Sequence, residues 1–461
     1  MKTDTPKAFS RDFTQGRVLP ALISFAFPLF LANLLQAAYN VVDMVVVGQV
    51  VGEAGLSGLS IGGDILSFLT FLSMGFSNAS QVIISQYIGA GLRERLSRFI
   101  GTMASFLLLC AVGMSTVCLI LREQILRWMN TPAESWDQAM AYAATCMLGL
   151  VFIYGYNIVS AILRGMGDSR RPFLFISIAA VLNLMLDLLF VVVFRWEAFG
   201  AALATVIGQG VSFITALIYL FRKRERFGIA LSPGNFRIDK GELAVLIKMG
   251  VPFALRSASV MFSKLFVNSW INSYGVTISA VTGIGYKVNT FANLMGTAIN
   301  TAGSSMVGQN MGAGRYDRVS RVLGAALVLN SICFSVMIAV VFLFPMPVFS
   351  LFTSDMRVLY GCMEFVPAAL TNFACSALRN SMNSFTSGCG NYKFNFAVAL
   401  VDGIVARIGF SLLLGLACGL GYFGFWMGDA LAGVTPFVLG AIYYLSGRWR
   451  KASSILRSEQ P

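Results

Sequence analysis

The sequence predicts an all-α integral membrane protein with twelve transmembrane helices in two six-helix bundles, related by a pseudo-twofold axis. Three observations support this fold class. Of the 461 residues, 57% are hydrophobic and 12% are charged, and the mean hydropathy is +0.74, outside the usual range of soluble globular chains. Apolar stretches of membrane-spanning length recur along the whole chain. Short motifs of the first half also return in the second half at a nearly constant distance.

About 18 apolar residues in succession are enough for a helix to cross a bilayer. Twelve segments qualify: 18–47, 54–86, 96–121, 138–163, 170–194, 199–221, 243–273, 278–309, 318–347, 358–387, 392–416 and 420–446. The longest polar insertion is too short to fold as a soluble domain, and the polar first residues carry no secretory signal. We therefore expect cytoplasmic tails over 1–17 and 447–461, an N-lobe over 18–221, a cytoplasmic linker over 222–242 and a C-lobe over 243–446.

The distribution of Lys and Arg predicts the orientation. If the chain starts in the cytoplasm, the gaps on that side and the adjoining span ends hold 24 Lys and Arg residues, and the opposite gaps hold four. Positive charges are retained on the cytoplasmic side, so we expect both termini there and the protein in the inner (plasma) membrane. This asymmetry and contact with anionic lipid explain the net charge of +13 without a nucleic-acid partner.

The two halves of the chain repeat each other. ISQYIGAGLRERLSRFIG, starting at Ile84, returns as VGQNMGAGRYDRVSRVLG, starting at Val307. At nearly the same offset, Pro28 returns as Pro252, and the GMGD sequence at 165–168 returns as GCGN at 388–391. Six spans per half place both halves in the same orientation, with the relating axis along the membrane normal. Neither GAG turn matches a phosphate-binding loop, so we interpret both as tight helix exits.

Composition also excludes several kinds of chemistry. The eight cysteines form no CxxC pair and mostly lie in apolar spans, which is typical of core residues and not of disulfides or a metal site. The sequence has no His, so any pH-linked step has to use carboxylates. No cofactor is expected, and we find no HExxH, nucleophile or nucleotide-loop motif of an intramembrane enzyme.

Polar residues inside two apolar spans form the candidate site. Asn183 and Asp187, in LNLMLDLLFVVV, are four residues apart and share one helix face. Tyr39 and Asp43 have the same spacing in the first span, and Thr205 is a plausible neighbour from the sixth. An ionised carboxylate in the bilayer interior costs roughly 2.5–3.5 kcal/mol, which something has to offset.

Two interpretations of these aspartates follow. The functional one is a site that takes up and releases H+ or Na+, with neutral Tyr, Asn and Thr ligands around the carboxylates. Na+ is then possible at Asp43, Asn183 and Asp187, and no other metal is expected. The structural alternative is a fixed, hydrogen-bonded or salt-bridged carboxylate that specifies helix packing.

The second half has a different charge balance. The counterparts of Asp43 and Asp187 are Val267 and Phe410, so the carboxylate pair is not repeated. Its spans instead combine bases and acids: Arg256, Lys264, Lys287, Arg379, Arg407, Glu364, Asp402 and Asp429. Some of these must form internal pairs, for example Asp402 with Arg407 or Arg379. Lys264 either contacts an anionic or zwitterionic substrate group or pairs with a buried acid.

Four residues are candidates for lining a cavity or contacting substrate. They are Asp64, Asn157, Lys264 and Arg407. Asp64 has two open interpretations, since it can line the cavity wall or lie near the outer interface.

Together these features resemble the multidrug and toxic compound extrusion (MATE) family of the MOP flippase superfamily, over about residues 18–446. The resemblance lies in PLFLANLLQAAYNVVDMVVVGQ of the first span, QYIGAG and QNMGAG after the second and eighth, LRGMGD after the fourth and LNLMLD in the fifth. The pattern is closer to DinF-like than to NorM-like members, because the seventh span lacks the additional acids of the latter.

The resemblance implies a secondary-active antiporter that exports amphiphilic, often cationic compounds while H+ or Na+ flows inward. It further implies that Asp43, Asn183 and Asp187 form the cation site, that Tyr39 and Thr205 support it, and that Pro28 bends the first helix. The expected partners are small amphiphilic organic substrates and the lipid bilayer. A monomer is sufficient for the rocker-switch alternating access that two lobes provide.

Two other transport functions remain as alternatives. A lipid-linked oligosaccharide or lipid flippase of the same superfamily suits the basic residues of the second half, but twelve spans, where some flippases have fourteen, and the carboxylate pair argue against it. A channel is less suitable, because tandem lobes and a one-sided carboxylate site favour alternating access.

Overall fold

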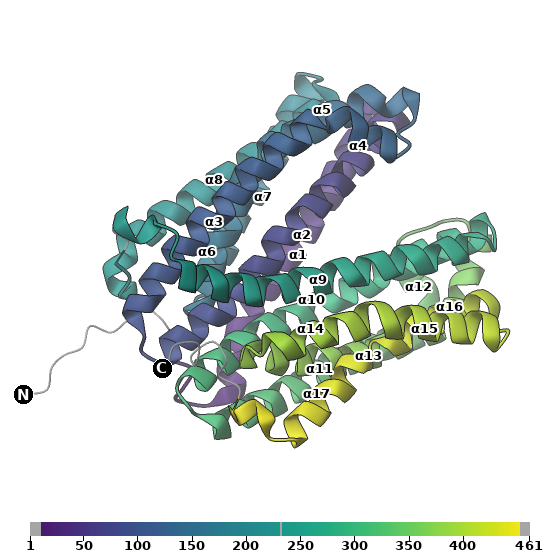
Figure 1. Cartoon of the computed structure of the whole chain (residues 1–461). Helices are drawn as coiled ribbons and strands as arrows, with labels where there is room; N and C mark the ends of the chain where they lie inside the picture. The colour runs from purple at the N-terminus through teal and green to yellow at the C-terminus, as the bar shows by residue number, and fades with distance from the viewer. Residues whose placement is uncertain (1–10, 231–232, 452–461) are drawn as a thin grey trace, which may run out of the picture. The chain divides into compact units, whose positions relative to one another are not determined.

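The computed structural model describes residues 11–230 and 233–451. All regular elements in these residues are helices (Figure 1). The α-helices are α1 Val18–Val51, α2 Glu53–Gly89, α3 Arg93–Ile120, α4 Arg122–Trp128, α5 Trp136–Leu148, α6 Leu150–Gly165, α7 Arg170–Asp187, α8 Glu197–Phe227, α9 Lys240–Asn272, α10 Val276–Gly312, α11 Tyr316–Leu343, α12 Pro345–Ser350, α13 Met356–Cys389, α14 Tyr392–Leu400, α15 Arg407–Leu412, α16 Gly421–Ala432 and α17 Thr435–Leu445. The predicted tails extend into residues 1–10 and 452–461, which lie outside the described residues.

Shorter helical segments connect these helices. The 3-10 turns are η1 Ala133–Ser135, η3 Pro233–Phe236 and η6 Arg448–Lys451, and the π-helical segments are η2 Leu188–Val193, η4 Val401–Ala406 and η5 Leu413–Ala417. The π segments continue α7, α14 and α15 without a loop, so the fifth and eleventh predicted spans are each continuous helical rods.

Ten of the described helices are long and apolar enough to cross a membrane. A further pair, Ala133–Leu148 and Leu150–Gly165, forms an eleventh span that bends by 47°. Gly149 lies at the bend, where a side chain would collide with Val206 of α8. Glycine is a common site of such helix kinks.

The remaining predicted span, residues 278–309, is α10. This helix has 37 residues, about 55 Å at 1.5 Å per residue, so its length is sufficient. Its mean hydropathy is lower than that of the other ten spans because Thr, Asn, Ser and Gly interrupt its aliphatic residues, so α10 is not counted among them. Several of them, among them Thr282, Asn289 and Ser305, are buried in a helix that packs along α11 and α13. The predicted all-α membrane fold is confirmed, and hydropathy undercounts this one span because protein covers its polar residues.

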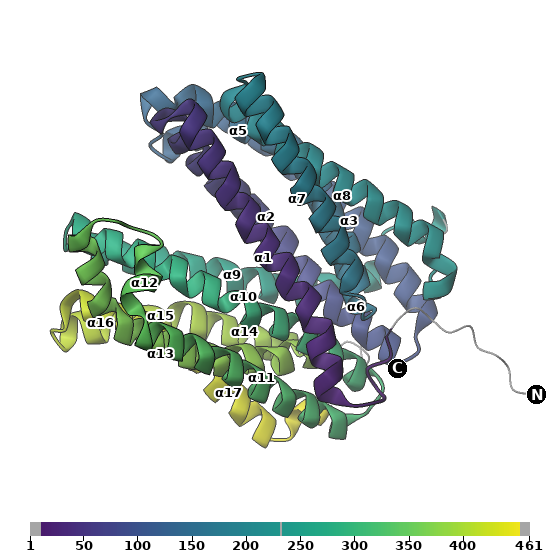
Figure 2. The ribbon, with the colours of Figure 1, turned by 180° about the vertical axis from the view of Figure 1, so that it is seen from behind.

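The chain divides into two compact units. Unit 1 contains Leu31–Ile88 and Leu92–Ile247, and unit 2 contains Asp12–Phe30 and Lys248 onward. In unit 1, α8 packs against α5, α6 and α7 (Figure 1). In unit 2, α13 packs against α10, α11, α16 and α17 (Figure 2). The predicted lobes differ from these units chiefly in α1, whose first part, up to just beyond Pro28, belongs to unit 2.

The repeat in the sequence is also a repeat of contacts. Four glycines lie so close to a neighbouring helix that an added Cβ atom would collide with it, and they form two pairs at the offset of the sequence repeat. These contacts are Gly165 with Ile84, repeated as Gly388 with Val307, and Gly62 with Tyr142, repeated as Gly285 with Phe365. Each half therefore uses the same close helix approaches, which only a residue without a side chain permits.

The two GAG turns end α2 and α10. Gly91 and Gly314 have φ values of +72° and +67°, in the left-handed region that glycine adopts at little cost. Both turns are therefore tight helix exits, as predicted.

An arginine follows each GAG turn and holds a different part of the chain. In unit 1, Arg95 Nε donates to Glu242 Oε1 over 2.9 Å, and the Tyr87 hydroxyl donates to Glu242 Oε2 over 2.6 Å. In unit 2, Arg318 Nη2 donates to the carbonyl oxygens of Phe13, Gln15 and Gly16 at 3.0–3.1 Å. Since Glu242 lies in the first turn of α9 and residues 13–16 precede α1, each arginine fixes the start of the first helix of one half.

Candidate functional site

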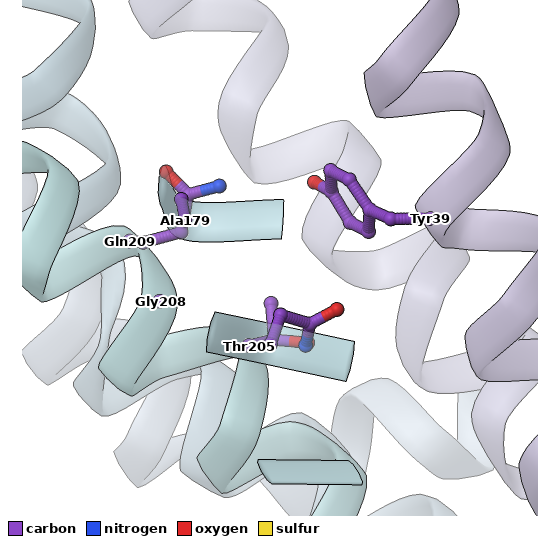
Figure 3. Close-up of a pocket in the computed structure, with 6 residues that line it drawn as sticks. Tyr39, Ala179, Thr205, Gly208 and Gln209 are labelled. Carbon is purple, nitrogen blue, oxygen red and sulfur yellow. The ribbon is translucent and has the colours of Figure 1, made fainter. Parts of the chain in front are cut away.

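Three of the predicted polar ligands of the first half, Tyr39, Asn183 and Thr205, line a small pocket in unit 1. The empty space is about 190 Å³ with the open solvent at its mouth included, below the roughly 300–1,000 Å³ of sites for drug-sized ligands. Figure 3 shows the ring of Tyr39 reaching toward the face of α8 that carries Thr205 and Gln209. The lining residues are Tyr39 of α1, Ala179 and Asn183 of α7, and Thr205, Gly208 and Gln209 of α8. The pocket therefore suits an ion or a few water molecules.

Helix geometry brings these side chains together. α7 continues as an α-helix to Asp187, so Asn183 and Asp187 lie one turn apart on the same face. Asn183 Nδ2 donates to Thr205 Oγ1 over 3.4 Å, a long hydrogen bond. The close approach depends on Gly208, where a Cβ atom would lie 3.1 Å from the carbonyl oxygen of Ala179.

Asp43 and Asp187 are both buried, with 6% and 1% of their surfaces exposed. Their carboxyl groups lie close enough to interact directly. Asp43 Oδ1 and both carboxylate oxygens of Asp187 have no hydrogen-bond donor in the part of the chain that the structure describes. Nor does either aspartate form an ion pair with Lys or Arg within those residues. Among the described residues, neither aspartate therefore has the salt bridge that is one form of the structural alternative.

This arrangement is suited to binding a cation. Two neighbouring carboxylates in an apolar surrounding are costly to keep ionised together, because their charges repel and burial penalises each of them. A proton between the carboxyl groups, or a bound Na+, removes that cost. Carboxylate and amide oxygens are also the ligands that hard cations prefer. All five predicted residues of this group lie in unit 1, and their binding of an ion stays a prediction.

Two further polar residues belong to the group and were not singled out from the sequence. Gln209 lines the pocket, and both Gln36 and Gln209 approach the Tyr39 hydroxyl. Gln209 follows Thr205 by four residues, the same one-turn spacing that connects Asn183 with Asp187. Applying that spacing to every polar residue of the sixth span would have identified it.

The other candidates of the first half lie in different surroundings. Pro28 is inside α1, which continues on both sides of it, and its predicted bending role stays a prediction. Asp64 is exposed on α2. Asn157 Nδ2 of α6 donates to Ser73 Oγ of α2 over 3.2 Å. A role in lining a cavity stays a prediction for Asp64 and Asn157.

In unit 2, Arg407 lies between two acids. It is 1% exposed, forms an ion pair with Asp429, and places Nη2 3.8 Å from Asp402 Oδ1. The anticipated pairing of Asp402 with Arg407 is therefore present, with Asp429 as the closer partner. Lys264 Nζ instead lies 5.2 Å from the centroid of the Tyr286 ring, and it forms no ion pair with a carboxylate of the described chain.

The family model of MatE matches residues 28–189 and 252–413. The chain belongs to the MatE family. The two matched segments of this MatE protein are equal in length and begin at Pro28 and Pro252, the two prolines of the sequence repeat. The family match therefore agrees with the repeat in sequence and contacts.

Curated relatives of this MatE protein are named as multidrug resistance proteins. The probable multidrug resistance protein YpnP of Bacillus subtilis (strain 168) is 28% identical, over 95% of this chain and 97% of the relative. The probable multidrug resistance protein NorM of Thermotoga maritima is 25% identical, over 95% of this chain and 94% of the relative.

Solved structures show the same fold. A crystal structure of MATE in the straight conformation has a TM-score of 0.87 and 20% identity, over 97% of this chain and 99% of that chain. A MOP superfamily transporter from Pyrococcus furiosus Vc1 has a TM-score of 0.89 and 20% identity, over 99% and 100%. This MatE protein is therefore a multi-pass membrane transporter of a multidrug efflux family, and not an enzyme.

Proposed function

We propose that the protein is a secondary-active antiporter that exports amphiphilic organic compounds in exchange for an inward flow of H+ or Na+. The observation that supports this proposal is the pair of buried, neighbouring carboxyl groups of Asp43 and Asp187. A purely structural carboxylate normally has a donor or a cation beside it. A site that a cation occupies reversibly needs no permanent donor or cation beside its carboxylates.

The coupling ion acts through an equilibrium between two states. Asp43, Asn183 and Asp187 bind the cation, and Tyr39 and Thr205 orient the carboxyl and amide groups. An ion shifts the balance between inward-open and outward-open states only by the difference in its affinity for them. A tenfold difference amounts to about 1.4 kcal/mol. Rocker-switch movement of the two lobes then exposes the bound substrate to the opposite side of the membrane.

The orientation belongs to the same proposal. The excess of Lys and Arg in alternate gaps supports cytoplasmic termini and the inner (plasma) membrane of the cell. A monomer contains both lobes and the whole carboxylate group, so it is sufficient for the cycle.

A lipid-linked oligosaccharide or lipid flippase is the second candidate. The observation that favours it is the set of basic side chains inside unit 2, which suits a pyrophosphate group better than an organic cation. The Asp43–Asp187 pair has no evident role in such a flippase, so we rank it second.

Ethidium transport into inside-out membrane vesicles tests the proposal. Wild type, Asp187→Asn and the matched control Asp137→Asn, at an exposed aspartate of α5, are compared under a pH gradient and, separately, under a Na+ gradient. We expect wild type and Asp137→Asn to respond to one of the gradients and Asp187→Asn to neither, which also identifies the ion. Equal transport by all three proteins would show that Asp187 is not a coupling residue. If none of them moves ethidium, an anionic or lipid-linked substrate becomes the better candidate.

A further inference from the structure

The second half of the chain contains an unusual charge cluster in the interior of unit 2. Its groups come from α9, α10, α13, η4, α15 and α16, so six segments contribute to one region. The members are Arg256, Lys264, Tyr286, Arg379, Asp402, Arg407 and Asp429. Four of these side chains are cationic and two are carboxylates, so the cluster has two more positive than negative charges.

The carboxylates are already engaged. Arg407, which is 1% exposed, forms an ion pair with Asp429 and lies 3.8 Å from Asp402 through Nη2. Arg256 and Arg379 interact electrostatically with Asp402 without an ion-pair contact among the described residues. Within the described chain, both acids therefore make their direct ion-pair contacts to Arg407, and Lys264 receives none.

Neutral groups hold two of the remaining cations. Lys264 Nζ lies over the Tyr286 ring at 5.2 Å, a cation–π geometry. Arg379 Nη2 donates to Ser376 Oγ over 3.0 Å and to Asn293 Oδ1 over 3.4 Å. Both cations are half-buried. Such contacts orient a cation but do not neutralise its charge, so its electrostatic cost in a low-dielectric interior persists.

A free donor lies in the same place. The Tyr286 hydroxyl is buried and has no hydrogen-bond partner in the described chain. The hydroxyl is on the ring that lies beneath the Lys264 ammonium, and Arg379, which contacts Asn293 of the same helix α10, adds a guanidinium to the cluster. A hydroxyl, an ammonium and a guanidinium are the donors that bind a carboxylate, sulfate or phosphate. An organic cation gains nothing from these groups.

We propose that this cluster, centred on Lys264, Tyr286 and Arg379, is a binding site for the anionic group of an amphiphilic substrate. Lys264 and Arg379 supply the charge, the Tyr286 hydroxyl supplies a directional hydrogen bond, and the Asp402–Arg407–Asp429 network fixes the surrounding helices. The proposal deepens the proposed function, since it assigns a substrate class to the transporter, and it depends on that function for its role. The anionic group belongs either to a transported amphiphile or to a lipid headgroup.

Equilibrium binding to the purified full-length protein tests this site without any gradient. Two fluorescent probes with the same twelve-carbon tail, one ending in phosphate and one in trimethylammonium, are titrated in neutral maltoside micelles and followed by anisotropy. We expect the phosphate probe to bind at least tenfold more tightly. Lys264→Gln should remove roughly tenfold or more of that affinity, while Lys264→Arg, which keeps the charge, should retain most of it. The matched control is Lys287→Gln on α10, whose lysine is exposed, and it should bind like wild type.

Each outcome decides the question. Equal affinity for the two probes, or equal losses in Lys264→Gln and Lys287→Gln, would overturn the site. Competition by phosphatidylglycerol in the micelles supports a lipid headgroup as the occupant, and competition by dodecyl phosphate alone supports a transported amphiphile. Anion binding that persists while Asp187→Asn transports normally would refute the proposed coupling and leave this site intact. If wild type shows ion-coupled ethidium transport but no preference for the phosphate probe, the anion site is refuted and the proposed coupling is left intact.

Discussion

Replacing Arg407 by Met removes the cation between two buried acids and should strongly destabilise unit 2. Arg407 is 1% exposed, and its partners Asp402 and Asp429 are 1% and 3% exposed, so solvent cannot screen the charges left behind. Breaking a buried ion pair by removing one partner typically costs about 3–5 kcal/mol. Met fills much of the same volume with a flexible apolar side chain, so most of the loss is electrostatic.

The expected loss is measurable as a change in melting temperature. For a unit of this size, 1 kcal/mol corresponds to about 2–4 °C, so Arg407→Met should melt roughly 6–20 °C lower than wild type. Thermal unfolding in maltoside micelles can be followed by intrinsic tryptophan fluorescence, to which the buried Trp426 and Trp449 of unit 2 contribute, and, independently, by the monodisperse peak in size-exclusion chromatography.

Two variants make this prediction specific. Arg315→Met removes an exposed partner of Asp317, at 4.0 Å with both side chains more than half exposed, and should leave the melting temperature within about 2 °C, because exposed pairs contribute little. Adding Asp402→Asn and Asp429→Asn to Arg407→Met should recover much of the loss, since no unpaired charge then remains. If Arg407→Met melts like wild type, the network does not stabilise unit 2 and the reasoning fails.

Three further predictions use the same stability measurement or a close variant of it. Asp187→Asn should not lower the melting temperature, because the carboxylate has no donor to lose among the described residues; a drop of more than about 5 °C, roughly 1–3 kcal/mol, would reveal a partner that the proposed cation site does not include. Glu242→Gln should weaken the anchor at the start of α9 by about 1.5–3 kcal/mol through loss of the charged hydrogen bond from Arg95, seen as faster amide exchange over residues 240–247, whereas the exposed Glu225→Gln should leave exchange there unchanged. Gly388→Ala should destabilise the protein by about 1–3 kcal/mol because the added Cβ would collide with Val307. The control Gly409→Ala, with open space around it, should be neutral or stabilising by up to about 1 kcal/mol. Similar melting temperatures of the two variants would contradict the tight packing of Gly388.

Much of the fold was accessible from the sequence because lipid imposes simple rules. Apolar length located the spans, and the repeat motifs set their grouping. The sequence located the span that contains Gly149 and the polar span of α10, but it did not show the bend of the first or the cover over the polar residues of the second. Both depend on neighbours: Val206 leaves no room for a side chain at Gly149, and packing buries polar residues of α10. One-turn spacing found Asn183 with Asp187 and Tyr39 with Asp43. It could not show that the two aspartates meet, since that requires α1 and α7 to approach each other in space.

The second half was harder to predict for a related reason. The sequence offered several partners for Asp402, and spacing along a helix did not select among them. The structure places Asp429, from α16, closest to Arg407 of α15, a contact between two helices that follow each other across a turn. The absence of a carboxylate partner for Lys264 in the described chain is equally invisible in the sequence, because the acids of the second half, such as Asp402 and Asp429, lie far from it along the chain and only the fold decides whether they reach it.

Comparison of the two halves shows which features of the repeat are physically replaceable. Gly165 and Gly388 make the same close contacts with a neighbouring helix, since any side chain at either position would collide with that helix whatever its chemistry. Charges have no such constraint, and the position of Asp187 is occupied by Phe410 in the second half. Unit 1 thereby holds the carboxylates of Asp43 and Asp187 with no ion pair to a cation among the described residues, whereas the charge cluster of unit 2 has more cations than carboxylates.

That division has a mechanistic consequence for the proposed antiporter. A cation and an anionic substrate group that occupy different units need not exclude each other by competition for one site. Their coupling must then pass through the equilibrium between transport states, so each ligand changes the other's affinity by the same factor. Na+ or low pH should therefore change the affinity of the phosphate probe for wild type, and Asp187→Asn should abolish that change. Without Na+ and at high pH, the affinity of Asp187→Asn for the probe should stay within about twofold of the wild-type affinity. An undiminished ion effect in Asp187→Asn would show that the two sites are not linked in this way.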